Sequence, residues 1–521
     1  MSSTLLFENG RVYPLSQPPI DDGALVVEDG RIAYVGPREH LGTVGGQGLR
    51  CIDLAGRALL PGLCDSHLHL QETAEWQDDL DLRGCEDVDD VRDRLRERTR
   101  RVPAGNWIVG SGWERERLFR HQAPSVTLLD QVAPGHPVFL VSKDLHSAWL
   151  NGPGLKALRS LDELPDTCDI DLDEHGETGL CFEAVLDLRR LLIPPRTAQA
   201  KQRLLGPCIR SLYSCGITAV HSFGDLESAR LLCEHMQQGG ERIRTLWNYI
   251  MDLDELDAQR PVLDEVLPGW LHRGNVKLFL DGSFGSWTAA LSRPYVGRND
   301  CGLLNISSED LQHALRRLRS HGLAAAIHAI GDRALETALA AMVAVDGGFD
   351  GHRIEHAQLV TPDIFQRYDL RGLHLSLQPS HMWTDRELVR RHLPAELRDS
   401  AYPLADLWNS GANICFSSDA PVENPDPLKG ILAAVHRRVG EDSVWNAAQC
   451  LSVHQALAAY SLNSARLPRA PSAGELRVGL PADLIVLAVD PQVILRFPDQ
   501  EPGERWPTDL TFLEGRCVYQ R

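Results

Sequence analysis

Eight short apolar segments constrain the fold of this chain more than any other feature of its sequence. Amphipathic helical patterns separate most neighbouring pairs, as in residues 308–322 and 332–345. Short apolar strands that alternate with helices are typical of parallel βα units, and eight such units close a (β/α)8 barrel. The sequence therefore predicts an α/β fold built on a (β/α)8 TIM barrel. The eight segments are residues 58–69, 216–225, 243–252, 275–283, 323–332, 352–359, 373–381 and 412–422.

The two ends of the chain follow a different pattern. Short segments there alternate apolar and polar residues, and turn signals such as "ENG" and "EDG" lie between them, which is typical of antiparallel strands joined by hairpins. We therefore expect one small composite β-sandwich domain made from residues 1–60 and 467–521. The barrel domain would then occupy residues 61–466.

The gap between the first and second barrel strands is too long for a loop, because structureless connections of that size are uncommon in compact domains. It contains a charged helical pattern at 88–102 and a strand-like run that begins at 136. We therefore expect an inserted subdomain at about 72–205, directly after the first barrel strand.

The charge of the chain excludes several kinds of partner. It has 521 residues, 43% of them hydrophobic, and a formal net charge of -19. Binding to nucleic acid or to an anionic membrane requires clustered Lys and Arg, which a chain this acidic does not favour. We therefore expect a small-molecule substrate, no nucleic acid and no membrane. A homodimer is among the assemblies that the sequence leaves open.

The location is predicted to be cytoplasmic. The chain has no apolar run long enough to span a membrane, and its first residues do not have the pattern of a signal peptide. None of its 12 cysteines forms a Cys-x-x-Cys pair, which argues against a zinc ribbon, a redox motif or a disulfide scaffold. Reduced, mostly buried thiols are the expected state.

Polar residues at the ends of the apolar segments indicate a site. His67 and His69 end the first segment, and side chains at i and i+2 of a strand point to the same side. Both imidazoles could therefore reach one metal ion, although a surface pair in a loop is the alternative. A single polar residue of this kind is more often a satisfied core residue. A set of them on one rim of the barrel is a much stronger indication, and the further members are Lys277, His328, His356 and Asp419.

The motifs around these residues resemble a known family. "PGLCDSHLH", "IHAIGD", "RIEHAQ", "SSDAP" and "GLPADLIVL" together resemble the metal-dependent amidohydrolase superfamily. "GSGWERERL", "DLHSAWLN" and "VKLFLDGSFGSWTAAL" are similar to its amidohydrolase 3 branch, which has a long insertion and includes N-substituted formamide deformylase. The resemblance covers nearly the whole chain, including both halves of the composite β-domain.

The resemblance implies a metal site. In the superfamily a His-x-His pair, a carboxylated lysine, two further histidines and an aspartate hold one or two divalent metals. Imidazole and carboxylate ligands without thiolates suit Zn²⁺, with Mn²⁺ or Fe²⁺ as alternatives. A free lysine is cationic near neutral pH, so it would need CO₂ to become a carbamate ligand. The residues that match these roles are His67, His69, Lys277, which we expect to be carboxylated, His328, His356 and Asp419.

The expected reaction is metal-dependent hydrolysis of a carbon–nitrogen bond other than a peptide bond. The substrate would be an amide or an N-formyl or N-acyl amine. A metal-activated water would attack, with Asp419 as general base and then general acid. Deamination of a heterocycle is the alternative within enzymes. A catalytically inactive barrel that binds a ligand is the alternative of a different class.

Four further residues are weaker candidates for contact with the substrate. Trp113 and His146 would come from the insertion, and His221 and Gln378 from the ends of two barrel strands. Tryptophan at such positions, including Trp149, more often packs than contacts a substrate. His146 could donate a hydrogen bond to the substrate carbonyl.

Overall fold

The computed structural model describes residues 4–42, 48–143, 147–161, 169–173, 176–182, 185–258, 267–438, 444–470, 474–494 and 507–521. The chain forms two compact units. One consists of Met1–Thr73 with Leu205–Arg521, and the other of Ala74–Leu204. The second unit follows the first barrel strand, as the predicted fold class requires. The domain boundaries drawn from the sequence stay a prediction.

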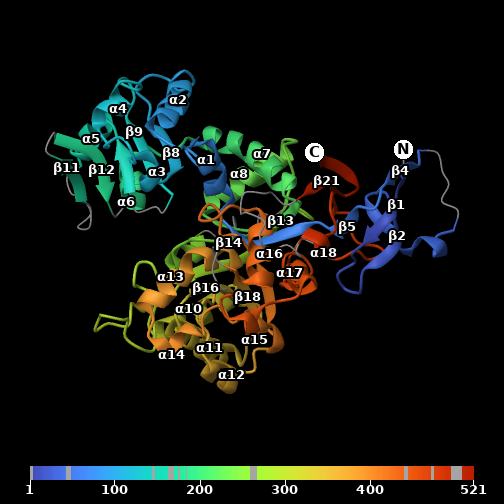
Figure 1. Cartoon of the computed structure of the whole chain (residues 1–521). Helices are drawn as coiled ribbons and strands as arrows, with labels where there is room; N and C mark the ends of the chain where they lie inside the picture. Colours follow the sequence, from blue (N-terminus) through green and yellow to red (C-terminus); the bar gives the residue numbers. More distant parts are fainter. Residues whose placement is uncertain are drawn as a thin grey trace. The chain divides into compact units, whose positions relative to one another are not determined.

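Eight parallel strands form the barrel (Figure 1). Every neighbouring pair is parallel, from the first strand to the last. The first and last strands also lie in contact, so the sheet is nearly closed. The predicted (β/α)8 barrel is therefore confirmed. Its strands are β6 (Leu63–Leu68), β13 (Ile217–Gly224), β14 (Arg244–Tyr249), β15 (Leu271–Phe279), β16 (Ala325–Ala329), β17 (Arg353–His356), β18 (His374–Leu377) and β19 (Asn413–Phe416).

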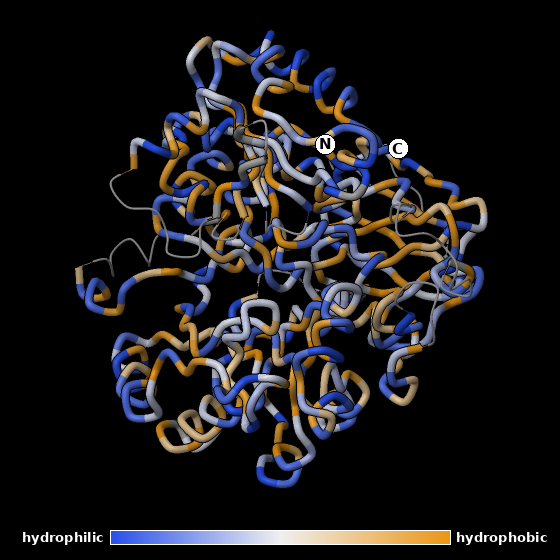
Figure 2. Tube along the Cα trace, turned by 60° about the vertical axis from the view of Figure 1, so that its left-hand side comes forward, coloured by the Kyte–Doolittle hydropathy of each residue, from blue (hydrophilic) through white to orange (hydrophobic). Residues whose placement is uncertain are grey.

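Helices connect most of these strands, and α10 shows why they form. In α10 (Ser308–Ser320) the buried residues recur at i, i+3, i+4 and i+7, from Leu311 to Leu318, which is one face of a helix. The hydroxyl of Ser307 accepts a hydrogen bond from the N–H of Asp310 and caps the first turn. Figure 2 shows hydrophobic and hydrophilic residues alternating along the helices in the same way. The other helices are α1 (Leu70–Asp78), α7 (Ala198–Ser214), α8 (Leu226–Gln237), α11 (Asp332–Asp346), α12 (Pro362–Arg367), α13 (Met382–His392), α14 (Ala395–Arg398), α15 (Leu404–Asn409), α16 (Pro427–His436) and α17 (Val453–Ala459).

Strands from both ends of the chain form one small β-domain, as predicted. They make a continuous eight-stranded sheet, in which a C-terminal strand pairs with an N-terminal one. Phe7 and Phe512 meet edge to face, with ring centroids 5.2 Å apart, so the two ends share one core. The strands are β1 (Thr4–Val12), β2 (Ile20–Glu28), β3 (Arg31–Pro37), β4 (Arg50–Asp53), β5 (Ala58–Pro61), β20 (Leu484–Leu487), β21 (Thr508–Leu513) and β22 (Arg516–Gln520).

The inserted unit, Ala74–Leu204, has a six-stranded sheet of its own. Three parallel strands continue into three antiparallel ones. Trp113 and Trp149 are buried in its hydrophobic core. Its strands are β7 (Leu80–Asp81), β8 (Ile108–Trp113), β9 (Val138–Ser142), β10 (Ser147–Leu150), β11 (Asp169–Asp173) and β12 (Gly176–Phe182), and its helices are α2 (Val88–Thr99), α3 (Arg115–Leu118), α4 (Val126–Asp130), α5 (Gly152–Leu158) and α6 (Val185–Leu192).

The described cysteines and helices can be compared with the features expected from the sequence. The described cysteines are free thiols, and most are buried, although Cys51 and Cys517 are exposed. Among the described residues, no helix combines the length and apolar character that a membrane crossing needs. The cytoplasmic location and the homodimer stay predictions.

A buried ion pair joins the barrel to the β-domain. Arg244, at the start of β14, is 2% exposed. Its guanidinium pairs with the Asp483 carboxylate, and its Nη2 donates to Glu514 Oε1 at 3.1 Å. A buried charge of this kind requires its partner, because the carboxylate would otherwise be left without compensation.

Arg244→Ala should therefore destabilise the protein by about 3–5 kcal/mol, the usual cost of removing one partner of a buried pair. Urea unfolding measures this loss. Arg371→Ala is the matched control, because Arg371 pairs with Asp369 on the surface, and exposed pairs contribute little. An Arg244→Ala protein that unfolds at the same urea concentration as the control would contradict the role of this pair.

Candidate active site

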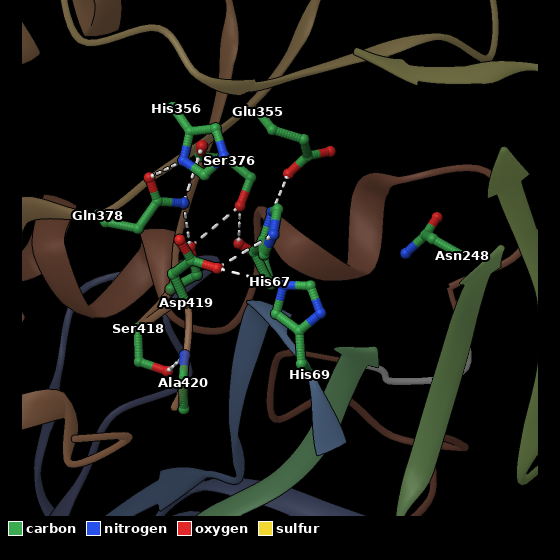
Figure 3. Close-up of polar contacts among 12 residues, drawn as sticks. His67, His69, Asn248, Glu355, His356, Ser376, Gln378, Ser418, Asp419 and Ala420 are labelled. Carbon is green, nitrogen blue, oxygen red and sulfur yellow. Dashed lines mark hydrogen bonds and ion pairs between the residues drawn. The ribbon is translucent and has the colours of Figure 1, made fainter. Parts of the chain in front are cut away.

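Candidate metal ligands converge at the C-terminal rim of the barrel. Ligand atoms of His67, His356 and Asp419 all lie within 4.8 Å of one another. His67 Nε2 is 3.3 Å from Asp419 Oδ1, and His69 Nε2 is 3.5 Å from the same oxygen. Figure 3 shows both imidazole rings turned towards the Asp419 carboxylate. The structure thus brings together residues that are more than 350 positions apart in the sequence.

Backbone hydrogen bonds fix the two ends of this cluster to each other. The N–H of Asp419 donates to the carbonyl of His67, and the N–H of His69 donates to the carbonyl of Ala420, both at 2.8 Å. Below them, the buried Asp65 carboxylate accepts from the N–H of His67 at 3.1 Å and from the N–H and hydroxyl of Ser418. The positions of these side chains are therefore set before any ligand is added.

Three histidines each bind a protein acceptor through one ring nitrogen. His67 Nδ1 is 2.6 Å from Glu355 Oε2, and His356 Nδ1 is 2.8 Å from Gln378 Oε1. His328 Nε2 is 3.1 Å from the Gly282 carbonyl. A metal-binding histidine usually donates its second N–H to such an acceptor, which orients the ring and leaves the other nitrogen available. The three rings are arranged in this way.

The protonation states suit a cation. Burial lowers the pKa of His67 and His328 to about 4 and that of His356 well below its usual range. Burial alone would raise the pKa of Asp419, but His67 and His69 together lower it well below its usual range. Neutral imidazoles around an ionised carboxylate are the donor states that a divalent metal needs. The residues present therefore fit the metal that the motifs imply.

Lys277 differs from the other buried charges of the barrel. Its side chain is buried, and no hydrogen bond or ion pair joins its ammonium to another described residue. Instead, its Nζ lies 4.8 Å from the centroid of the Phe223 ring and 5.3 Å from that of Phe279. Burial lowers its pKa to about 8, so a fraction of the amine is neutral near neutral pH. The neutral amine is the form that can add CO₂.

Of the two substrate contacts predicted in the inserted unit, Trp113 and His146, only Trp113 can be compared with the structure. Trp113 is 1% exposed, and its indole N–H donates to the Leu140 carbonyl at 2.8 Å. Trp149 is also buried and donates to the Thr178 carbonyl. These contacts favour a packing role for both over contact with a substrate. His146 lies outside the described residues.

The two candidates from the barrel strands also have partners inside the protein. His221, in β13, is fully buried, and its Nδ1 is 3.1 Å from Arg353 Nη1. Gln378 holds His356 through its amide oxygen and donates from its amide nitrogen to the Ser417 hydroxyl at 2.8 Å. Both contacts favour a positioning role over direct contact with a substrate.

Residues that the sequence analysis missed lie directly behind the ligands. Glu355 contacts His67, Arg353 contacts Glu355, and Asp65 holds the backbone of His67. All three are buried in barrel strands. The candidate ligands were identified as polar residues within apolar segments. The charged residues in "RIEH" and "CDSH" have the same pattern, so the sequence could have indicated them as well.

Comparisons of sequence identify the family. A model of the group described as "Amidohydrolase family" matches residues 50–519. YtcJ of Bacillus subtilis (strain 168), whose name includes the word amidohydrolase, is 28% identical over 533 residues, which cover 99% of each chain. N-substituted formamide deformylase of Arthrobacter pascens is 23% identical over 531 residues, or 96% of this chain and 95% of the relative.

A solved structure has the same architecture. The crystal structure of an uncharacterized metal-dependent hydrolase from Pyrococcus horikoshii OT3 matches with a TM-score of 0.77 at 30% sequence identity. The match covers 94% of this chain and 98% of that chain. The two chains therefore share their fold over nearly their whole length.

His67→Ala and His69→Ala should each lose bound metal while the barrel stays folded. The reason is that both rings would contribute more to binding the cation than to packing the core. Elemental analysis gives the metal content, and circular dichroism gives the fold. His374→Ala is the matched control, since His374 begins β18 at the opposite end of the barrel. Metal content equal to that of the control in both variants would show that the pair is structural.

Proposed function

The chain belongs to the amidohydrolase family, and we propose that it hydrolyses a carbon–nitrogen bond, other than a peptide bond, in a small amide or an N-formyl or N-acyl amine. One observation carries this proposal: ligand atoms of His67, His356 and Asp419 lie within 4.8 Å of one another at the rim of the barrel. The name of the Arthrobacter pascens relative supports the N-formyl class.

A divalent cation, preferably Zn²⁺ with Mn²⁺ or Fe²⁺ as alternatives, would acidify a water molecule and polarise the substrate carbonyl at this site. The chain contributes nitrogen and oxygen donors only, which suits these metals. Lys277 would take part as its carbamate, because the ammonium itself cannot be a ligand. The proposed ligands are His67, His69, Lys277, His328, His356 and Asp419.

Asp419 is the proposed catalytic residue. Its carboxylate is ionised and lies within reach of both rings of the His-x-His pair. It would take a proton from the attacking water as the oxygen–carbon bond forms. It would then deliver this proton to the nitrogen as the carbon–nitrogen bond breaks. The products are a carboxylic acid and an amine.

The exposed ring of Phe279 bears on the substituents of the proposed substrate. This residue ends β15, and its side chain is 44% exposed. Its ring centroid lies 5.9 Å from that of His328. An exposed aromatic ring beside the candidate ligands gives an apolar substituent a surface to cover, which is typical of small-molecule sites. We therefore propose a substrate with an apolar group next to the hydrolysed bond.

Removal of the metal tests the proposed function. A chelator should abolish activity by removing the cation, and added Zn²⁺ or Mn²⁺ should restore it by binding to the deprotonated donors again. The assay screens N-formyl and N-acyl amines with aromatic and short alkyl substituents and measures the amine released. Release of ammonia from a heterocycle would instead identify a deaminase. Full activity in a metal-free preparation would rule out the mechanism.

Asp419→Asn should separate catalysis from metal binding. The amide keeps the shape and one oxygen donor but removes the basic site, so much of the metal should remain. Loss of general acid–base catalysis typically lowers kcat about 10²- to 10⁴-fold. Steady-state kinetics on the metal-loaded variant measures this change. A near-normal kcat with metal bound would place the base elsewhere.

Lys277→Ala is the contrasting variant for the same experiment. It should lose metal occupancy, because the carbamate would be a ligand, and not only catalysis. A short carboxylic acid should restore part of the metal by supplying the missing oxygen donors. Unchanged metal content in Lys277→Ala would show that this lysine has no role in binding the cation.

A further inference from the structure

The candidate ligands donate to acceptors of different charge. His67 faces a carboxylate of Glu355, whereas His356 faces the neutral amide of Gln378. His328 Nε2 faces the Gly282 carbonyl, and Asp281 Oδ1 lies 3.5 Å from the same nitrogen. Figure 3 shows Glu355 and Gln378 bound to different rings of the same cluster. Hydrogen bonds to ionised groups are shorter and roughly twice as strong as neutral ones. The distance from His67 to its acceptor is the shortest of the three, at 2.6 Å.

Arg353 forms an ion pair with the Glu355 carboxylate inside the barrel, through Nε to Oε1 at 2.5 Å. Nη2 of Arg353 donates to Glu355 Oε2 at 2.9 Å and to the Ser66 carbonyl at 2.7 Å. The proton shared with His67 therefore stays on Nδ1 of the ring. The lone pair of Nε2 then points towards Asp419, 3.3 Å away.

The backbone conformation explains how two neighbouring residues, Glu355 and His356, can both contact the ring of His67. Neighbouring side chains of a strand normally point to opposite sides. The strand ends at His356, where φ is +76°, and this left-handed conformation interrupts the alternation. Glu355 thus contacts His67 from within the barrel, while the ring of His356 lies 5.0 Å from that of His67 at the rim.

We infer that Glu355 is a positioning residue that makes His67 the anchoring ligand for the first divalent cation to bind. His356, which donates to the neutral amide of Gln378, contributes weaker attraction for the cation. This inference rests on the proposed metal-dependent activity and goes beyond it, because it assigns unequal roles to histidines that the motif treats alike. Outer-shell partners of this kind typically change metal affinity 10- to 100-fold.

Titration of Zn²⁺ into the metal-free full-length protein, in competition with a chromophoric chelator, tests the inference. Glu355→Gln keeps the shape but makes the acceptor neutral, so affinity for the first equivalent should fall about 10- to 100-fold. Glu355→Asp, which keeps the charge, should recover part of this loss. Thermal unfolding is measured alongside, since Arg353 loses its carboxylate partner in Glu355→Gln.

Gln378→Glu is the reciprocal variant. It gives His356 a charged acceptor, so affinity for the cation should rise. A purely structural role for both residues would lower affinity in both variants, and that result would overturn the inference. With Co²⁺ in place of Zn²⁺, the visible spectrum of the first equivalent should change in Glu355→Gln and stay as in the wild type in Gln378→Glu.

The outcomes separate this inference from the proposed function. A wild-type protein that binds none of Zn²⁺, Mn²⁺ and Fe²⁺ would contradict both the proposed function and the inference on Glu355. A wild-type protein that binds Zn²⁺ tightly, with equal affinity in Glu355→Gln, would overturn only the role of Glu355. A His67→Ala variant that keeps the first equivalent at wild-type affinity would likewise show that His67 is not the anchor.

Discussion

The first and last barrel strands, β6 and β19, meet at the seam of the nearly closed barrel, and the candidate site depends on this contact. Parallel strands that close into a barrel bring all their C-terminal ends to one rim. Across the seam, backbone hydrogen bonds of 2.8 Å join Asp419 to His67 and His69 to Ala420. The proposed base and the histidine pair are therefore held together by the backbone itself. A cation would bind to a cluster whose order the fold has already imposed, which reduces the entropy lost on binding.

Most of the charged side chains described behind the rim are compensated by partners inside the protein. Arg353 and Glu355 neutralise each other, and Asp65 accepts hydrogen bonds from the N–H groups of His67 and Ser418. Buried charges persist only with such compensation. Lys277 is the exception, since its ammonium lies among aromatic rings without a hydrogen bond to another described residue. Glu355 and Asp419 attract this ammonium electrostatically but form no hydrogen bond with it, so the amine is available for the proposed carbamate.

The sequence predicts the barrel and the candidate ligands for the same physical reason. Strand residues such as those of "AAIHAIGD" must be apolar to pack, so a histidine among them stands out. The same logic could have identified Glu355 but not its partner, because only tertiary structure brings it to His67, 288 positions away. Gln378 directly follows β18, as the sequence predicts, but its bond to His356 depends on the orientation of its amide. Local patterns predict which residues face the barrel, whereas long-range packing decides what each of them touches.

Two of the proposed ligands at the rim have a left-handed backbone conformation. His356 and Asp419 have φ values of +76° and +57°, a region that costs a residue with a side chain about 1–3 kcal/mol. Glycine would adopt these conformations at less cost. It would also remove an imidazole or a carboxylate from the cluster. The chain keeps the strained residues and supports them with neighbouring backbone hydrogen bonds, such as that from the N–H of Ala357 to the Ala329 carbonyl. Glycine would cost less at both positions, so the proposed ligand roles would explain why each position has a side chain.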